Sequence, residues 1–82
     1  TERIITMWMR ETYIPLDMIF ARCGGEIVHI HANAVPHDET IISSRRHASV
    51  VLEVNGGFAA QHGVKVGDRL VHPKLPREVC AP

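Results

Sequence analysis

The chain has 82 residues, of which 45% are hydrophobic and 22% charged, a composition typical of one small globular domain rather than a disordered segment. A domain of this size buries only about 60% of the surface that its unfolded chain exposes, so a covalent staple or a partner would add to its stability. The formal net charge is zero, which argues against nucleic-acid partners, because these need a clustered basic face. No stretch approaches the roughly 20 apolar residues of a membrane span.

Hydrophobic residues alternate with a period of two along much of the chain, which is typical of half-buried β-strands. Pro15 interrupts the first run, because proline cannot donate to a strand ladder. Gly24 and Gly25 favour a tight hairpin turn. We therefore predict strands over residues 4–9, 16–21, 26–32, 48–54 and 69–72.

The alternation also predicts which side chains share a face of each strand. In the second strand, Leu16, Met18 and Phe20 should point one way and Asp17 and Ile19 the other. In the third, we expect Val28 and Ile30 to point inward and His29 and His31 outward. In the fourth, the side chains expected to face the core are Ala48, Val50, Leu52 and Val54.

The segment 33–46 is rich in Pro, His, Asp and Ser and predicts a loop, with Ile41–Ile42 as a candidate short strand inside it. Asn55 is a candidate N-cap for one helix near residues 55–62, which Gly63 would end. We expect the tail 73–82 to fray.

These elements predict a mainly β fold, a small barrel or sandwich of about five short strands with one short helix, in a single domain over residues 1–82. The first strand would leave an uncovered edge if a segment preceding it in the full protein were absent. Such an edge pairs readily with another chain, so a homo-oligomer formed through a strand edge is a candidate state.

Three histidines make the best candidate metal site. His29 and His31 are two residues apart on a predicted strand and so project to the same face, with His37 or Asp38 completing the set of ligands. This arrangement would suit a metal-assisted hydrolase. The competing interpretation is that the histidines form a polar outer face, and on it we expect no bound cofactor.

Other motifs carry less information. The run from Arg45 to His47 is basic, and we interpret it as a solvated turn. Neither glycine pair has the spacing of a phosphate-binding loop. Cys23 and Cys80 could form one bridge in an oxidising compartment or remain free thiols.

The segment 8–20 combines an aromatic residue, a proline turn and ion-forming side chains. A candidate ligand pocket is formed by Trp8, Arg10, Thr12 and Asp17, because their polar side chains would surround the indole ring of Trp8. The alternative is structural, with Asp17 accepting hydrogen bonds from Thr12, from turn amides or from Arg10.

This segment resembles the hallmark Trp-Met-Lys-Asn-Thr-x-Ile-Pro-Leu-Asp of a family of small bacterial and archaeal proteins, domain-of-unknown-function family 192. Two positions depart from it, with Arg10 for the usual Lys and Glu11 for the usual Asn. The similarity continues through Ile27-Val28, Asn33-Ala34, Pro36, Val51-Leu52-Glu53, Gly56-Gly57, Gly63 and Gly67-Asp68.

The resemblance implies a mainly β fold but brings no established activity with it. Members of that family are often secreted and carry a segment before the hallmark that this chain lacks, so the resemblance implies a periplasmic or extracellular location. We therefore expect a non-enzymatic extracytoplasmic binding or accessory module for an unknown small ligand or protein. The hydrolase that uses His29 and His31 is the alternative.

Overall fold

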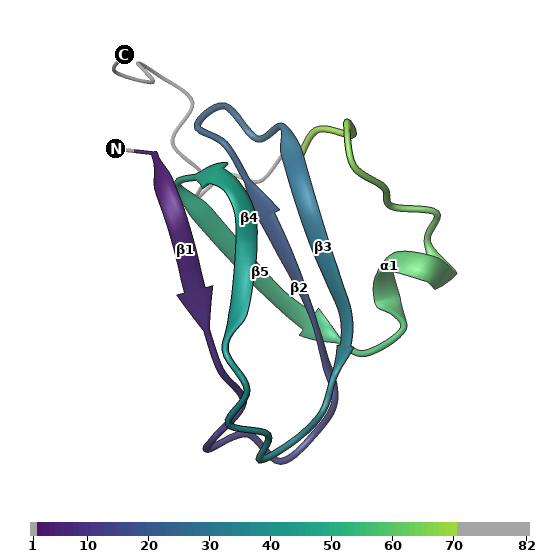
Figure 1. The fold of residues 1–82 in the computed structure, drawn as a ribbon. Helices are drawn as coiled ribbons and strands as arrows, with labels where there is room; N and C mark the ends of the chain where they lie inside the picture. The colour runs from purple at the N-terminus through teal and green to yellow at the C-terminus, as the bar shows by residue number, and fades with distance from the viewer. Residues whose placement is uncertain (1, 71–82) are drawn as a thin grey trace.

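The computed structural model describes residues 2–70, which form five strands and one short helix. The elements are β1 (Arg3–Met7), β2 (Leu16–Ala21), β3 (Ile27–Ala34), β4 (Ile42–Ala48), β5 (Val50–Asn55) and α1 (Phe58–Gln61). β1 pairs with β4, and β2 lies between β3 and β5 in a second sheet, with every pairing antiparallel (Figure 1). The predicted mainly β fold is confirmed, and the sheets do not close into a barrel.

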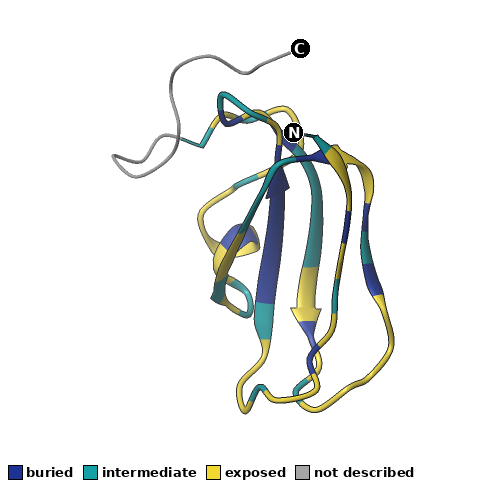
Figure 2. Cartoon of the chain, turned by 90° about the vertical axis from the view of Figure 1, so that its left-hand side faces the viewer, coloured by how far each residue is buried: buried dark blue, intermediate teal, exposed yellow. Residues whose placement is uncertain are grey.

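β2 is the central strand, and both of its faces are covered. Met18 and Phe20 are fully buried in the core between the two sheets, with Ile5 and Ile42 on the opposite side. Asp17 faces the other way and bonds the start of α1. In Figure 2, β2 is accordingly buried along nearly its whole length. The predicted division of this strand into two faces is therefore confirmed.

The predicted orientation of the histidines on β3 is wrong. His29 pairs with Phe20 and His31 with Met18, and residues paired directly across two strands share a face. Both histidines thus lie half-buried on the inner side of the sheet. The reason is a bulge beside Val28, because one extra residue in a strand inverts the alternation that follows it.

The predicted facing of the fourth strand is also wrong in part. Ala48 and Val50 belong to different sheets, because the chain crosses from β4 to β5 at Ser49. Val51 pairs with Phe20 and packs on the core, whereas Leu52 lies on the opposite face and is 39% exposed.

The loop predicted over residues 33–46 is confirmed only for residues 35–41. The candidate short strand at Ile41–Ile42 belongs to a longer one, since β4 begins at Ile42. β4 pairs with β1, and three residues from Ser44 to Arg46 bulge out opposite Ile5. The buried Ser44 hydroxyl accepts the Ile5 N–H at 2.9 Å and donates to the Arg46 carbonyl at 2.7 Å. A side chain therefore replaces the backbone partners that the bulge removes.

The helix falls within the predicted range, but Gly57 rather than Asn55 is its N-cap, with a φ of 90°. No helix within residues 2–70 is long and apolar enough to cross a membrane.

Of the predicted last strand, Arg69 forms a single bridge with Glu26. Cys23 is disulfide-bonded. The rest of that strand, Cys80 and the tail 73–82 lie outside the described residues.

Replacing Ser44 with alanine should lower the free energy of unfolding by about 1–3 kcal/mol, because the Ile5 N–H and the Arg46 carbonyl lose a buried partner. Ser49→Ala is the matched control, since the buried Ser49 hydroxyl oxygen has no hydrogen-bond partner among the described residues. Its removal should leave the stability unchanged or raise it. Urea denaturation measures both, and equal losses in the two variants would contradict the role given to Ser44.

Candidate functional site

Within the segment 8–20, Asp17 is the side chain that makes the most hydrogen bonds. Its carboxylate is fully buried and accepts three backbone N–H bonds, from Asn33 at 2.8 Å, Gly57 at 3.1 Å and Ala59 at 2.9 Å. Asn33 lies in a bulge of β3 with a φ of 54°. Gly57 and Ala59 lie at the start of α1. The carboxylate therefore joins β2 to β3 and to the start of α1. The prediction that amides of the proline turn bind Asp17 is wrong, because none of its three donors belongs to that turn.

These contacts also set the ionisation of Asp17. Burial raises the pKa of the carboxyl and is the largest single influence, but the amides of Asn33, Ala59 and Gly57 together outweigh it. The pKa of Asp17 is accordingly lowered from its ordinary value, so the group is an anion at neutral pH. It has no need of Arg10 as a charge partner.

The predicted contact of Asp17 with Arg10 and Thr12 is wrong. The Arg10 guanidinium lies 3.8 Å from Glu39 and 5.3 Å from the centre of the Trp8 ring. The Thr12 hydroxyl donates to the Met9 carbonyl at 3.0 Å. The structure thus keeps Trp8, Arg10 and Thr12 together at one end of the molecule and places Asp17 inside the fold.

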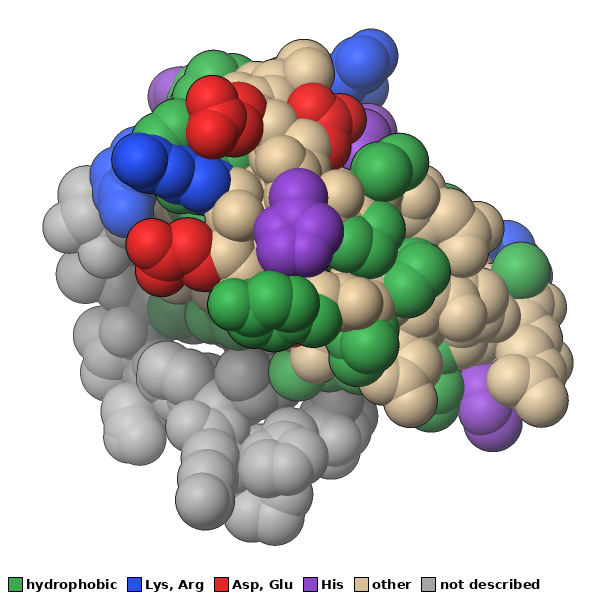
Figure 3. Space-filling view, turned by 90° about the horizontal axis from the view of Figure 1, so that it is seen from below, with side chains coloured by type: hydrophobic (Ala, Val, Ile, Leu, Met, Phe, Trp, Pro, Cys, Tyr) green, Lys and Arg blue, Asp and Glu red, His purple; other side chains and the backbone are tan. Residues whose placement is uncertain are grey.

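That end of the molecule is built by two loops, residues 8–15 and 35–41, and it exposes apolar side chains. The Met9 N–H donates to the Asp38 carbonyl at 3.0 Å and ties the loops together. Figure 3 looks onto this end and shows hydrophobic side chains gathered beside a histidine, bordered on one side by charged groups. We call this the loop-end surface; its exposed members are Trp8 (46%), Tyr13 (80%), Ile14 (54%), Val35 (59%) and Ile41 (60%).

The three candidate metal ligands do not meet. His29 stacks on Phe20 with 5.9 Å between ring centres, whereas His37 lies at the loop end with its ring 5.0 Å from that of Tyr13. Burial lowers the pKa of His29, and the nearby charges of Arg45, His31 and Arg46 lower it further. Within residues 2–70, no group of three His, Cys, Asp or Glu side chains could hold a metal ion.

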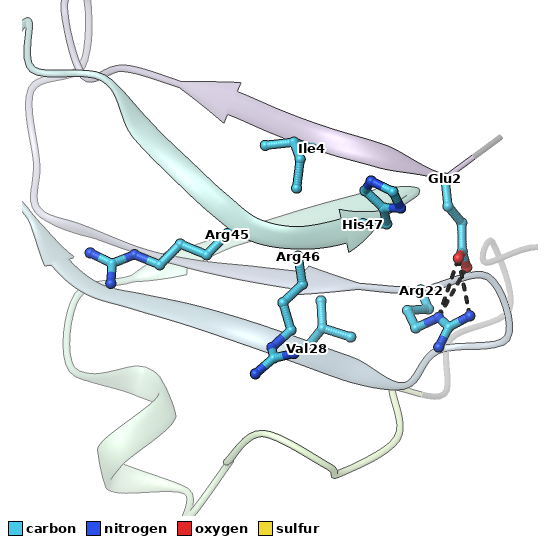
Figure 4. A pocket seen from close by; sticks show the side chains of 7 residues that line it. All are labelled: Glu2, Ile4, Arg22, Val28, Arg45, Arg46 and His47. Atoms are coloured by element: carbon cyan, nitrogen blue, oxygen red, sulfur yellow. Dashed lines mark hydrogen bonds and ion pairs between the residues drawn. The ribbon is translucent and has the colours of Figure 1, made fainter.

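A basic groove lies between the sheets, and the sequence did not predict it. It is an open groove of about 440 Å³, lined by residues of β1, β3 and β4, by Glu2 and by Arg22, which follows β2 (Figure 4). At one end Arg22 and Glu2 form an ion pair at 3.2 Å. The only signal in the sequence was the basic run that we interpreted as a solvated turn. The groove is lined by Glu2, Ile4, Arg22, Val28, Arg45, Arg46 and His47.

Comparison with known proteins places the chain in a family. A family model described as an uncharacterized ACR, DUF192, matches residues 1–72. The chain belongs to the DUF192 family. Among the curated proteins none matches it.

Two crystal structures resemble this DUF192 domain. One, from Sinorhizobium meliloti 1021, is of a protein provisionally named a transcription regulator, at 51% identity and a TM-score of 0.82. The other is a protein of unknown function from Novosphingobium aromaticivorans DSM 12444, at 47% identity and a TM-score of 0.79. They are matched over 84% and 83% of this chain but over only 54% and 49% of their own, so this chain spans about half their length.

Asp17→Ala should lower the free energy of unfolding by at least about 3 kcal/mol, because it leaves three N–H donors without their acceptor in the interior. Asp38→Ala is the matched control: the exposed Asp38 side chain accepts the Thr40 N–H, so its loss should cost about 1 kcal/mol or less. Chemical denaturation measures both. An unchanged midpoint for Asp17→Ala would show that the carboxylate does not hold the fold together.

The lowered pKa of Asp17 also predicts a pH dependence of stability. A group whose pKa is lower in the folded state stabilises the fold above its unfolded pKa, here near 3.8, and this contribution is lost as the pH falls through the folded value. Between about pH 5 and pH 3, the free energy of unfolding should therefore fall less steeply in Asp17→Asn than in the unmodified protein. In Asp38→Asn, the free energy of unfolding should fall with pH almost as steeply as in the unmodified protein. If the pH dependence weakened equally in both variants, Asp17 would not be its source.

Proposed function

We propose that this domain is a non-enzymatic, extracytoplasmic binding or accessory module that docks a partner protein through its loop-end surface. The observation that carries the proposal is the concentration of five large, exposed apolar side chains on the two loops at this end. Contiguous exposed apolar patches of this kind are typical of interaction sites in soluble proteins.

The composition of the loop-end surface favours a protein partner. Trp, Tyr and Arg are the residues most enriched among those that dominate binding energy at interfaces. Arg10 lies against Trp8, and its ion pair with Glu39 forms part of a charged border. An apolar centre with a polar rim is the usual anatomy of a protein–protein interface.

The loops that carry this surface are held in place before any partner arrives. Met9 is fully buried in the core, its N–H is bonded to the second loop, and its carbonyl accepts the Thr12 hydroxyl. Binding would therefore require little ordering of the backbone, which lowers its entropic cost.

The alternatives have less support. The cavity at this end, beside Trp8 and Ile41, measures about 200 Å³, which is below the roughly 300–1,000 Å³ of typical small-molecule sites. The name of one similar structure suggests DNA as a partner, but the zero net charge of this chain argues against it. No observation on the described residues favours the metal-assisted hydrolase.

The extracytoplasmic location rests on the resemblance to a family whose members are often secreted. Fractionation of cells that express the full-length protein tests it separately from docking. Recovery with the periplasm or medium supports this part of the proposal, and recovery with the cytoplasm contradicts it.

Selection from a phage-displayed library of random peptides tests the docking surface. We expect enriched apolar peptides that perturb the amide resonances of residues 8–15 and 35–41. Tyr13→Ser combined with Ile14→Ser should weaken their binding at least about tenfold, because two of the five exposed apolar side chains of the interface are removed.

Val66→Ser is the control, because Val66 is 58% exposed but follows α1, away from the two loops. It should leave peptide binding unchanged. Perturbations elsewhere, or equal losses in both variants, would contradict the docking surface. A dimer in sedimentation that the Tyr13 and Ile14 substitutions dissociate would assign the surface to self-association instead.

A further inference from the structure

The basic groove has the geometry of a second binding site, distinct from the loop-end surface. In Figure 4, the Arg22–Glu2 pair closes one end, and Arg45 points along the groove away from that pair. Arg46 points toward the strand that carries Val28. The lining thus combines guanidinium groups with two aliphatic side chains, those of Ile4 and Val28.

The charges in the groove are unbalanced. Glu2 accepts hydrogen bonds from Arg22 and from the Cys23 N–H, so its carboxylate is already engaged. No ion pair forms on Arg45 or Arg46 within residues 2–70. Three arginines therefore face one glutamate in a chain whose formal net charge is zero. This concentration of positive charge favours an anion.

The backbone that presents the two arginines is held in a costly conformation. Arg45 has a φ of 64°, in the left-handed region that residues other than glycine rarely adopt. The Ser43 hydroxyl accepts the Arg45 N–H at 2.9 Å, and the Ser44 hydroxyl donates to the Arg46 carbonyl at 2.7 Å. Strained residues that their surroundings fix in this way cluster at functional sites.

We propose that the basic groove binds a small organic anion, with Arg45 and Arg46 holding its phosphate or carboxylate and Ile4 and Val28 covering its apolar part. Guanidinium groups hold either anion through paired N–H bonds. The volume of about 440 Å³ fits a small molecule. The lowered pKa of His29, caused first by burial and then by Arg45, His31 and Arg46, is consistent with excess positive charge beside the groove. The inference is independent of the docking proposed above.

Titration with butyl phosphate, inorganic phosphate and butanol, followed by amide resonances, tests the assignment. We expect saturable shifts at Ile4, Val28 and residues 45–47, with butyl phosphate binding more tightly than inorganic phosphate and butanol not binding. Arg46→Gln should weaken butyl phosphate binding about tenfold, through the loss of charge-assisted hydrogen bonds. Arg10→Gln, the same charge change at the loop end, should leave it unchanged.

Arg45→Gly separates binding from folding, because glycine adopts the left-handed conformation without strain. We expect its denaturation midpoint to be retained or raised and its affinity for butyl phosphate to fall several-fold. The proposal is overturned by the absence of saturable shifts, by equal losses in Arg46→Gln and Arg10→Gln, or by full affinity in Arg45→Gly. Displacement of butyl phosphate by a short DNA duplex at equal salt would also overturn it, in favour of a nucleic-acid site.

Discussion

The arrangement of the second sheet depends on one buried carboxylate. Asp17 lies on the central strand and accepts N–H bonds from β3 and from Gly57 and Ala59 at the start of α1. β3 and β5 flank β2, and α1 follows β5, so one side chain on β2 holds both β3 and the start of α1. Gly56 completes the junction, because a Cβ there would lie 2.9 Å from the Pro15 side chain. The chain can thus leave β5 closely packed against the turn that precedes β2.

The sequence predicted the fold class and the two faces of β2, because residues 16–21 alternate without interruption and the strand has no bulge against β5. It did not predict β4, since Ser and Arg residues occupy the bulge and give no alternating pattern. Hydroxyl groups there replace backbone partners. The histidines of β3 were assigned to the wrong face for a related reason: periodicity assumes one residue per position, and a bulge adds one.

The candidate site was predicted only in part. Trp8, Arg10 and Thr12 share one end of the molecule, because they belong to one turn. Asp17 follows that turn closely in sequence but points into the other layer, where backbone amides are its partners. The basic groove could not be read from the sequence, because it draws on segments near residues 2–4, 22, 28 and 45–47. Only the stacking of the two sheets brings these together.

Both proposed surfaces lower the stability of the isolated domain. The loop-end surface leaves apolar area in water. The groove holds two arginines that form no ion pair within residues 2–70, on a strained bulge between β4 and β1. A ligand that binds only the folded state stabilises it by mass action, so occupancy of either surface would offset its cost. In the groove this effect would reach the whole sandwich, because the lining residues belong to both sheets. An anion held there would bridge two layers that are otherwise joined mainly by side-chain packing.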